Sequence, residues 1–287
     1  MNLTNLADIR ALLARHDFRF SKSMGQNFLT AAWVPADIAD ASGADDRTGV
    51  LEVGPGIGCL TEQLAQRAAK VVSVELDERL RPVLAETLAG YPNVELVFGD
   101  VLALDLPQLV SERFSGLRPV VCANLPYNVT SPLLTAFLTA GCFDTVTVMI
   151  QREVARRLCA RPGTADYGAL TVFVQWHAEP ELLFDVPPHC FVPAPKVTST
   201  VVRLRVRSPA RCGAGRKAAV HRRARGVQSA PQDAHQRALG RCARLRQSTC
   251  CRGRRRLRAR CARARRDARF GAVRRFERCT RHRDRLT

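Results

Sequence analysis

A glycine-rich turn at the end of an apolar run is the first feature that could do chemistry. Residues 51–58 read Leu-Glu-Val-Gly-Pro-Gly-Ile-Gly and precede a stretch with helical spacing. Glycines permit positive φ angles and let a ligand approach the backbone without meeting a Cβ atom. The N-terminus of the following helix offers unpaired N–H donors. The pattern fits a ligand-binding turn, and a plain tight turn fits it equally well.

Two acidic residues follow the next two apolar runs. Glu75 lies 21 residues after Gly54, where a carboxylate can accept hydrogen bonds from ribose hydroxyls. Asp100 follows Val94–Phe98 and Gly99, and its short side chain could bond an adenine amino group. Acidic residues are ordinary at strand ends. Three such features at successive strand ends nevertheless indicate a cofactor that contains a nucleoside.

Asn124-Leu125-Pro126-Tyr127 follows a fourth apolar run. The Asn124 amide oxygen and the Leu125 carbonyl can accept hydrogen bonds from an exocyclic amine, which directs the nitrogen lone pair toward an electrophile. The Tyr127 ring can stack on the base, a contact worth roughly 1–3 kcal/mol in single-stranded nucleic acid binding. An Asn-capped turn before a helix at Ser131 is the structural alternative.

Alternating strands and helices are expected to position these residues. Short runs rich in β-branched residues predict the strands Val50–Val53, Val71–Glu75, Val94–Phe98, Val120–Asn124, Thr145–Ile150, Glu181–Val186 and Ser199–Val206. Longer stretches predict the helices Leu6–His16, Leu60–Ala69, Glu78–Ala89, Leu106–Phe114 and Ser131–Thr139. A further predicted helix carries Arg152, Arg156, Arg157 and Arg161. Arg19–Leu29 and Pro187–Pro195 are expected to be loops. This alternation predicts a doubly wound α/β, Rossmann-like domain.

These motifs together resemble the ribosomal RNA adenine dimethyltransferases. The matching segments occur in order and are Gly25-Gln26-Asn27-Phe28-Leu29, the turn from Glu52 to Gly58, Asn124–Tyr127, and Phe191-Val192-Pro193-Ala194-Pro195-Lys196-Val197. The likeness covers about residues 6–207. Within the family it is closest to the members that dimethylate two neighbouring adenosines near the 3′ end of the small-subunit RNA.

The resemblance implies S-adenosyl-L-methionine as the cofactor and assigns residues to it. Asn27 and Leu29 would contact the cofactor from the N-terminal loop. Gly54 would lie beneath its methionine part, Glu75 would hold the ribose, and Asp100 would hold the adenine.

The resemblance also assigns residues to the reaction. Asn124 would serve cofactor and target base together, in a catalytic group with Leu125, Pro126 and Tyr127. Phe191 would form the opposite wall of the base pocket, unless it is simply a core residue. The expected partner is small-subunit ribosomal RNA in an immature 30S particle, and the expected state is a cytoplasmic monomer. No metal ion is expected, because the cysteines before residue 209 form no C-x-x-C pair and have no histidine at ligand spacing.

Three alternatives remain open on the sequence. A large-subunit adenine methyltransferase of the macrolide-resistance type would carry much the same motifs. A non-catalytic ribosome-assembly factor would bind small subunits without using Asn124–Tyr127. An NAD-dependent dehydrogenase would explain Gly54–Gly58 and Glu75, but would leave Gln26–Leu29 and Asn124–Tyr127 without a purpose.

Composition divides the chain near residue 208. Residues 1–209 carry 19 Lys and Arg against 22 Asp and Glu, whereas residues 210–287 carry 26 against 4. We therefore predict an N-terminal helix and loop in 1–48, a catalytic domain in 49–207, and an Arg/Ala/Cys-rich tail in 208–287 that is disordered and stands where the family has a small helical domain. Neither a signal peptide nor an apolar run of about 20 residues is present, so no membrane association is expected.

The tail has the composition of GC-rich DNA read in a shifted frame. It contains 25 Arg but only one Lys, which is unusual for a basic RNA-binding arm. With synonymous codons chosen for Val220–Leu239, a frame shifted by one base can spell FTAVRAAFSQRRKTLINALS. That string has helical apolar spacing and resembles the start of the family's C-terminal domain. A frameshift is therefore our hypothesis for 208–287, and a genuine Arg-rich arm is the alternative.

Overall fold

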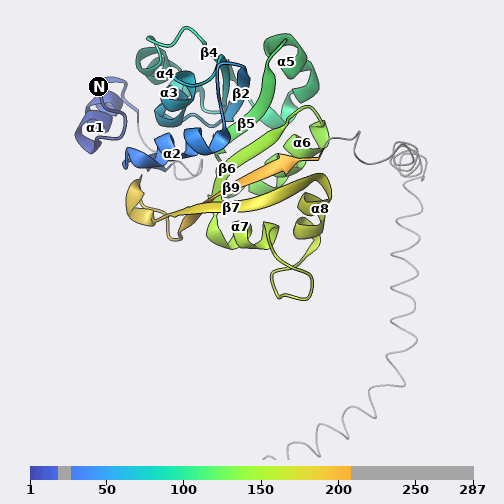
Figure 1. Cartoon of the computed structure of the whole chain (residues 1–287). Coiled ribbons are helices and arrows are strands. Elements are labelled where there is room, and N and C mark those ends of the chain that lie inside the picture. Colours follow the sequence, from blue (N-terminus) through green and yellow to red (C-terminus); the bar gives the residue numbers. More distant parts are fainter. Residues whose placement is uncertain (19–26, 208–287) are drawn as a thin grey trace, which may run out of the picture. The chain divides into compact units, whose positions relative to one another are not determined.

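The computed structural model describes residues 1–18 and 27–207, which are built around a seven-stranded mixed sheet (Figure 1). The strand order is β4-β3-β2-β5-β6-β9-β7. The strands are β2 (Thr48–Val53), β3 (Lys70–Glu75), β4 (Val94–Phe98), β5 (Arg118–Asn124), β6 (Thr145–Gln151), β7 (Ala178–Val186) and β9 (Ser199–Val206). All seven strands predicted from the sequence are present, so the prediction of a doubly wound α/β domain is confirmed.

Strand direction divides the sheet into two parts. The five strands from β4 to β6 are parallel, and β2 lies between β3 and β5. Strand β9 is antiparallel to both of its neighbours, β6 and β7. Strand β9, the last strand among the described residues, is therefore inserted inside the sheet. Its first residue lies beside the end of β6, where Ser199 is opposite Gln151.

Helices cover both faces of the sheet. The α-helices are α1 (Leu6–Arg15), α2 (Trp33–Ser42), α3 (Cys59–Ala65), α4 (Arg81–Thr87), α5 (Leu106–Arg113), α6 (Thr130–Ala140), α7 (Arg152–Leu158) and α8 (Ala169–His177). Short 3₁₀ turns occupy η2 (Glu78–Leu80), η3 (Val101–Ala103) and η4 (Pro188–Cys190). Figure 1 shows α2 and α3 on one side of the sheet and α6 and α8 on the other.

Alternation along each central strand supplies the two faces with apolar side chains. In β2, Val50 packs with Val34 and Ile38 of α2, whereas its neighbour Leu51 packs in the cluster that contains α6. Successive side chains of a strand point to opposite faces, so a strand covered on both sides is buried along its whole length and is mostly apolar. All six residues of β2 are buried, and Glu52 is its one charged residue.

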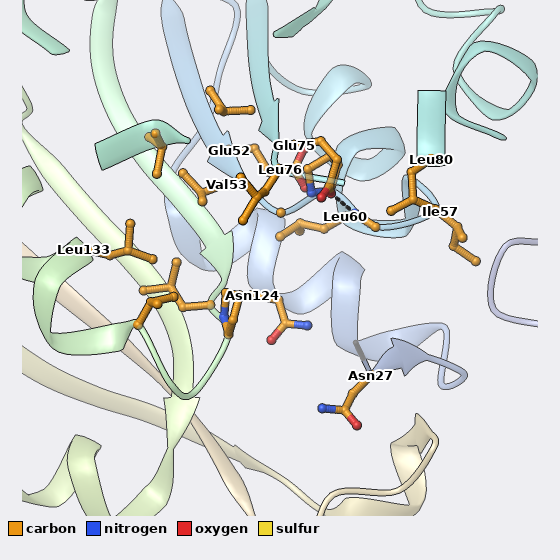
Figure 2. A pocket seen from close by; sticks show the side chains of 18 of the residues that line it. Asn27, Glu52, Val53, Ile57, Leu60, Glu75, Leu76, Leu80, Asn124 and Leu133 are labelled. Atoms are coloured by element: carbon orange, nitrogen blue, oxygen red, sulfur yellow. Dashed lines mark hydrogen bonds between the residues drawn. The ribbon is translucent and has the colours of Figure 1, made fainter. Parts of the chain in front are cut away.

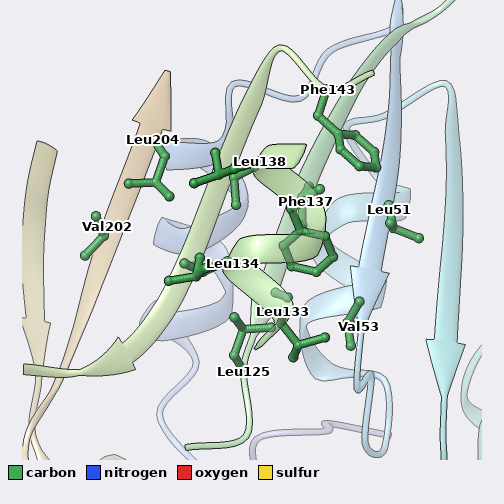
Figure 3. Packing of buried hydrophobic residues seen from close by; sticks show 14 of the residues in the cluster. Leu51, Val53, Leu125, Leu133, Leu134, Phe137, Leu138, Phe143, Val202 and Leu204 are labelled. Carbon is green, nitrogen blue, oxygen red and sulfur yellow. The ribbon is translucent and has the colours of Figure 1, made fainter. Parts of the chain in front are cut away.

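Helix α6 forms the centre of the larger core. Its residues Leu133, Leu134, Phe137 and Leu138 are all at most 3% exposed and lie against the sheet (Figure 3). Phe137 meets Phe143 edge to face, with ring centroids 6.3 Å apart. This packing fixes the start of α6, and with it the connection that leaves β5.

A second sheet joins the N-terminal segment to the last loop of the domain. Strand β1 (Phe28–Leu29) pairs antiparallel with β8 (Phe191–Val192), so that Leu29 is opposite Phe191. Helix α1 begins at its cap Asn5, whose side chain accepts hydrogen bonds from the amides of Ala7 and Asp8. The buried side of α1 packs with Phe18, Phe28 and residues of α4.

The structure corrects several predicted elements. The loop predicted for Arg19–Leu29 contains strand β1, and the loop predicted for Pro187–Pro195 contains η4 and β8. Helix α3 stops at Ala65, four residues before the predicted end. The helix predicted for Glu78–Ala89 is a 3₁₀ turn followed by α4, because Pro82 takes a position in the first turn of α4.

Helices α2 and α8 lie outside the predicted elements. The apolar face of α2 consists of Val34, Ile38 and Ala39, and the helix ends at Gly43 with φ +66°. Pro35 in its first turn is compatible with a helix start.

Several predictions lie outside the described residues. They are the motif residues Gly25 and Gln26, and the tail 208–287 with its proposed frameshift. The divisions at 48/49 and 207/208 stay predictions. In the part of the chain that is described, no helix is long and apolar enough to span a membrane.

Candidate functional site

One cavity lies at the carboxyl ends of the parallel strands (Figure 2). All ten residues that the sequence analysis assigns to a site line it, namely Asn27, Leu29, Gly54, Glu75, Asp100, Asn124, Leu125, Pro126, Tyr127 and Phe191. They lie in or directly before β1, at or just after the carboxyl ends of β2, β3, β4 and β5, and at the start of β8. The structure therefore brings together residues up to 164 positions apart, from Asn27 to Phe191.

The glycine-rich turn leaves open space beside its backbone. Gly54 and Gly56 have φ angles of +70° and +61°, which L side chains rarely adopt. A Cβ atom at Gly54 would meet nothing within 4 Å, whereas one at Gly56 would approach the Phe28 ring to 3.1 Å. The Gly54 amide donates to the Val74 carbonyl at 2.9 Å and so ties the turn to β3. The space above Gly54 is therefore free to accept a ligand against the backbone.

Glu75 connects this turn to the end of β3. Its Oε2 atom accepts a hydrogen bond from the Gly56 amide at 3.3 Å, and its Oε1 atom accepts one from the Asp77 amide at 2.9 Å. Burial raises the pKa of the Glu75 carboxyl, and these two backbone amides oppose the rise. Each oxygen has a second lone pair, so both can still accept hydrogen bonds from a diol.

Glu52 is a second carboxyl group that lines the cavity, and it is only 1% exposed. The Ser73 hydroxyl donates to its Oε2 atom. Burial raises the pKa of Glu52 to about 7, the nearby Glu75 adds to the rise, and the Ser73 hydrogen bond opposes it. The sequence does not predict a role for Glu52, because the pattern Leu-Glu-Val carries no sign that the glutamate is buried.

Two exposed leucines line the cavity. Leu76 and Leu102 are 58% and 44% exposed, respectively. Asp100 also lines the cavity, and its Oδ1 atom accepts a hydrogen bond from the Leu102 amide at 2.9 Å. Exposed leucines beside a carboxylate suit a flat ring that carries an amino group. Neither leucine was singled out from the sequence.

Several hydrogen bonds hold the turn after β5. The Leu125 amide donates to the Met149 carbonyl at 3.1 Å, and the Val129 amide and Thr130 hydroxyl donate to the Pro126 carbonyl at 3.3 Å and 3.2 Å. In Figure 2 the Asn124 amide lies between the Glu52–Glu75 pair and Asn27. Because these hydrogen bonds fix the backbone of the turn, the Asn124 side chain is held in position before any ligand binds.

Two aromatic rings border the cavity near Asn124. Tyr127 is partly exposed, and its hydroxyl lies 2.7 Å from the Ser199 hydroxyl. Phe191 is 2% exposed and also packs in the core cluster of α2 and α3. Phe191 therefore has a core role, and its predicted contact with a base stays a prediction. In the described residues, no group of three His, Cys, Asp or Glu side chains could hold a metal ion.

Comparisons with known proteins point to one family. The family model described as "Ribosomal RNA adenine dimethylase" matches residues 17–212. Proteins named "Ribosomal RNA small subunit methyltransferase A" are 48% identical over 196 residues in Alkaliphilus oremlandii and 49% identical over 201 residues in Geobacillus thermodenitrificans. The matches cover 68% of both chains in the first case and 69% of both in the second.

Two solved structures share the fold. The 23S rRNA methyltransferase ErmE is 36% identical, with a TM-score of 0.54 over 63% of this chain and 70% of that one. A dimethyladenosine transferase from Plasmodium falciparum is 29% identical, with a TM-score of 0.55 over 62% and 63% of the two chains. The first is named as an rRNA methyltransferase and the second as a dimethyladenosine transferase.

Replacing Glu52 with Gln should change how stability depends on pH. The pKa of the buried Glu52 carboxyl is raised from 4.5 to about 7. Its contribution to the free energy of unfolding is therefore fully present below pH 4.5 and is lost as the pH rises through 7. Glu52→Gln has no such charge to bury. Its unfolding free energy should therefore gain on the wild type by about 2 kcal/mol between pH 5 and pH 8. Urea unfolding of both proteins at the two pH values measures this gain, and parallel pH profiles would contradict the assigned titration.

Proposed function

Because the chain belongs to the ribosomal RNA adenine dimethylase family, we propose that it transfers methyl groups from S-adenosyl-L-methionine to adenosine N6 amines in small-subunit ribosomal RNA. The targets would be two adjacent adenosines near the 3′ end of that RNA. The observation that carries the proposal is the position of Asn124, which shares one cavity with the glycine turn and with Glu75.

The cavity offers groups that fit each part of the cofactor. The open backbone at Gly54 leaves room for the methionine part. The Glu75 oxygens can accept hydrogen bonds from the ribose hydroxyls. Asp100, which lines the cavity together with the exposed Leu76 and Leu102, can accept one from the adenine amine. Asn27 and Leu29 close the cavity from the N-terminal segment.

The residues after β5 would hold the target base. The Asn124 side-chain oxygen and the Leu125 carbonyl can accept hydrogen bonds from the two N6 protons. Those bonds direct the nitrogen lone pair into the cavity and stabilise the positive charge that develops on the nitrogen. Tyr127 would stack on one face of the base, and Phe191 would border the other.

Positioning is the main contribution of this chain to the reaction. The sulfonium of the cofactor supplies an electrophilic methyl group without help from an acid or base. Asn124 and Leu125 would orient the amine, Tyr127 would fix the plane of the base, and the buried walls would exclude water. The base must leave its stack to enter the cavity. Afterwards the alkylated amine, which is strongly acidic, can release its proton to solvent.

The small subunit is the favoured substrate among the alternatives. Relatives named for that subunit are 46–49% identical to this chain, whereas the 23S rRNA enzyme is 36% identical. An immature 30S particle as the direct substrate, a monomeric state and a cytoplasmic location belong to the same proposal. The intact Asn124–Tyr127 turn favours an enzyme over a non-catalytic assembly factor.

Glu75→Ala should weaken cofactor binding. Loss of charge-assisted hydrogen bonds to the ribose should cost about 1–3 kcal/mol in S-adenosyl-L-methionine affinity. Isothermal titration calorimetry on the full chain measures the Kd. The control is Glu78→Ala, three residues on, where an exposed glutamate pairs with Arg81. An unchanged Kd in Glu75→Ala would remove Glu75 from the cofactor site.

Asn124→Ala should lose methyl transfer while it keeps the fold. The rate should fall by on the order of a hundredfold, since the amine loses its oriented acceptor. Single-turnover transfer from labelled cofactor to unmethylated small subunits, with the full chain in excess, measures the rate. Asn128→Ala is the matched control, because it removes an exposed asparagine from the same connection. Wild-type rates in Asn124→Ala would refute the proposed function of this residue.

We also propose that residues from about 210 onward are translated out of frame. The family match ends at residue 212, and the alignments to relatives cover about two thirds of both chains. Resequencing the gene across codons 205–220 tests the proposal, and an uninterrupted frame that encodes the printed tail would end it. If it holds, the chain should bind S-adenosyl-L-methionine through residues 1–207 but methylate ribosomal particles poorly.

A further inference from the structure

A buried serine holds the tyrosine that borders the base pocket. The Tyr127 hydroxyl and the Ser199 Oγ atom are 2.7 Å apart, although the residues are 72 positions apart in the chain. Ser199 is fully buried at the start of β9. Burial raises the pKa of the Tyr127 phenol, so the hydroxyl keeps its proton and can donate to Ser199. Neither the motif pattern nor the mechanism above uses Ser199.

Ser199 is itself fixed on both sides. It is opposite Gln151 of β6 and Val186 of β7, since β9 lies between these two strands. The preceding residue, Thr198, accepts a hydrogen bond from the Arg152 amide at 3.0 Å. A hydroxyl in this position is a rigid anchor for a partner outside the sheet.

The same segment of chain carries the other wall of the pocket. Phe191 lies eight residues before Ser199 and is held by its pairing with Leu29. Tyr127 comes from a different connection, between β5 and α6. The hydrogen bond from Tyr127 to Ser199 therefore joins the two segments that supply the aromatic walls of the cavity.

We propose that Ser199 is a positioning residue that fixes the orientation of the Tyr127 ring and so sets the gap into which the target adenine enters. The inference rests on the proposed function. A ring held by its hydroxyl cannot tilt away from the base, which keeps the amine aligned with the methyl donor. Alignment is hardest to keep in the second transfer, when N6 already carries one methyl group. Loss of the anchor should therefore slow the second transfer more than the first.

Five full-chain variants test this role. Ser199→Ala and Tyr127→Phe each remove the hydrogen bond from one side, and the double variant removes both partners. Ser199→Thr keeps a hydroxyl. Thr200→Val is the matched control, because it removes the next hydroxyl of β9, which is bonded to Asp185 at 2.5 Å. The measurements are single-turnover methylation of unmethylated small subunits, the ratio of monomethyl to dimethyl adenosine, and the Kd for S-adenosyl-L-methionine.

Ser199→Ala and Tyr127→Phe should each lower the methylation rate roughly tenfold and accumulate monomethyl adenosine. The double variant should be no worse than either single one, because both remove the same contact. Cofactor Kd should stay within about twofold, and Ser199→Thr should restore the product ratio while Thr200→Val leaves it unchanged. A wild-type rate and product ratio in either single variant, or additive losses in the double variant, would overturn the proposal.

A spectroscopic measurement tests the contact without activity. The chain has three tyrosines, so 3-fluorotyrosine labelling gives a simple ¹⁹F spectrum in which Tyr127→Phe identifies the Tyr127 signal. That signal should shift in Ser199→Ala and return toward its place in Ser199→Thr. An unmoved signal in Ser199→Ala would also overturn the proposal. A wild-type chain that transfers no methyl group would contradict the proposed function instead, and the fluorine spectra would still decide whether Ser199 holds Tyr127.

Discussion

The parallel pairing of β2 with both β3 and β5 is the constraint on which the rest of the site depends. Because chain connections leave β2 and β5 toward opposite faces of the sheet, a crevice opens at the carboxyl ends of these two strands. The glycine turn follows β2, Glu75 ends β3, and Asn124 ends β5. Residues that are distant in the sequence therefore line one cavity. Its lining includes the backbone of the glycine turn, the Glu75 carboxylate and the Asn124 amide.

Electrostatics in this crevice is arranged around two buried carboxyl groups. Glu52 and Glu75 both line the cavity, and burial raises the pKa of each. Burial disfavours the ionised form of both carboxyl groups. Hydrogen bonds from the Ser73 hydroxyl and from the backbone amides of Gly56 and Asp77 offset only part of this cost. A ligand that carries positive charge would relieve this arrangement. S-adenosyl-L-methionine carries a sulfonium and an ammonium group against one carboxylate, so its net positive charge suits a cavity lined by two carboxyl groups.

Local patterns in the sequence predicted the parallel strands and the residues at their ends, because apolar β-branched runs and strand-end polar residues are local signals. Pairing was not predictable in the same way. The insertion of β9 between β6 and β7, and the pairing of Leu29 with Phe191, depend on contacts between distant segments. The burial of Glu52 and the hydrogen bond from Tyr127 to Ser199 likewise depend on contacts between segments that are distant in the sequence. Short elements such as β1 carry too few residues to show a period.

Intermolecular NOEs from cofactor bound to the full chain test most directly whether the crevice brings the methyl donor to Asn124. S-adenosyl-L-methionine labelled with ¹³C at its transferable methyl group provides one isolated signal. The arrangement of β2, β3 and β5 predicts NOEs from that methyl group to the Asn124 side-chain amide and the Tyr127 ring. NOEs to residues outside this cavity, with none to Asn124 or Tyr127, would contradict it.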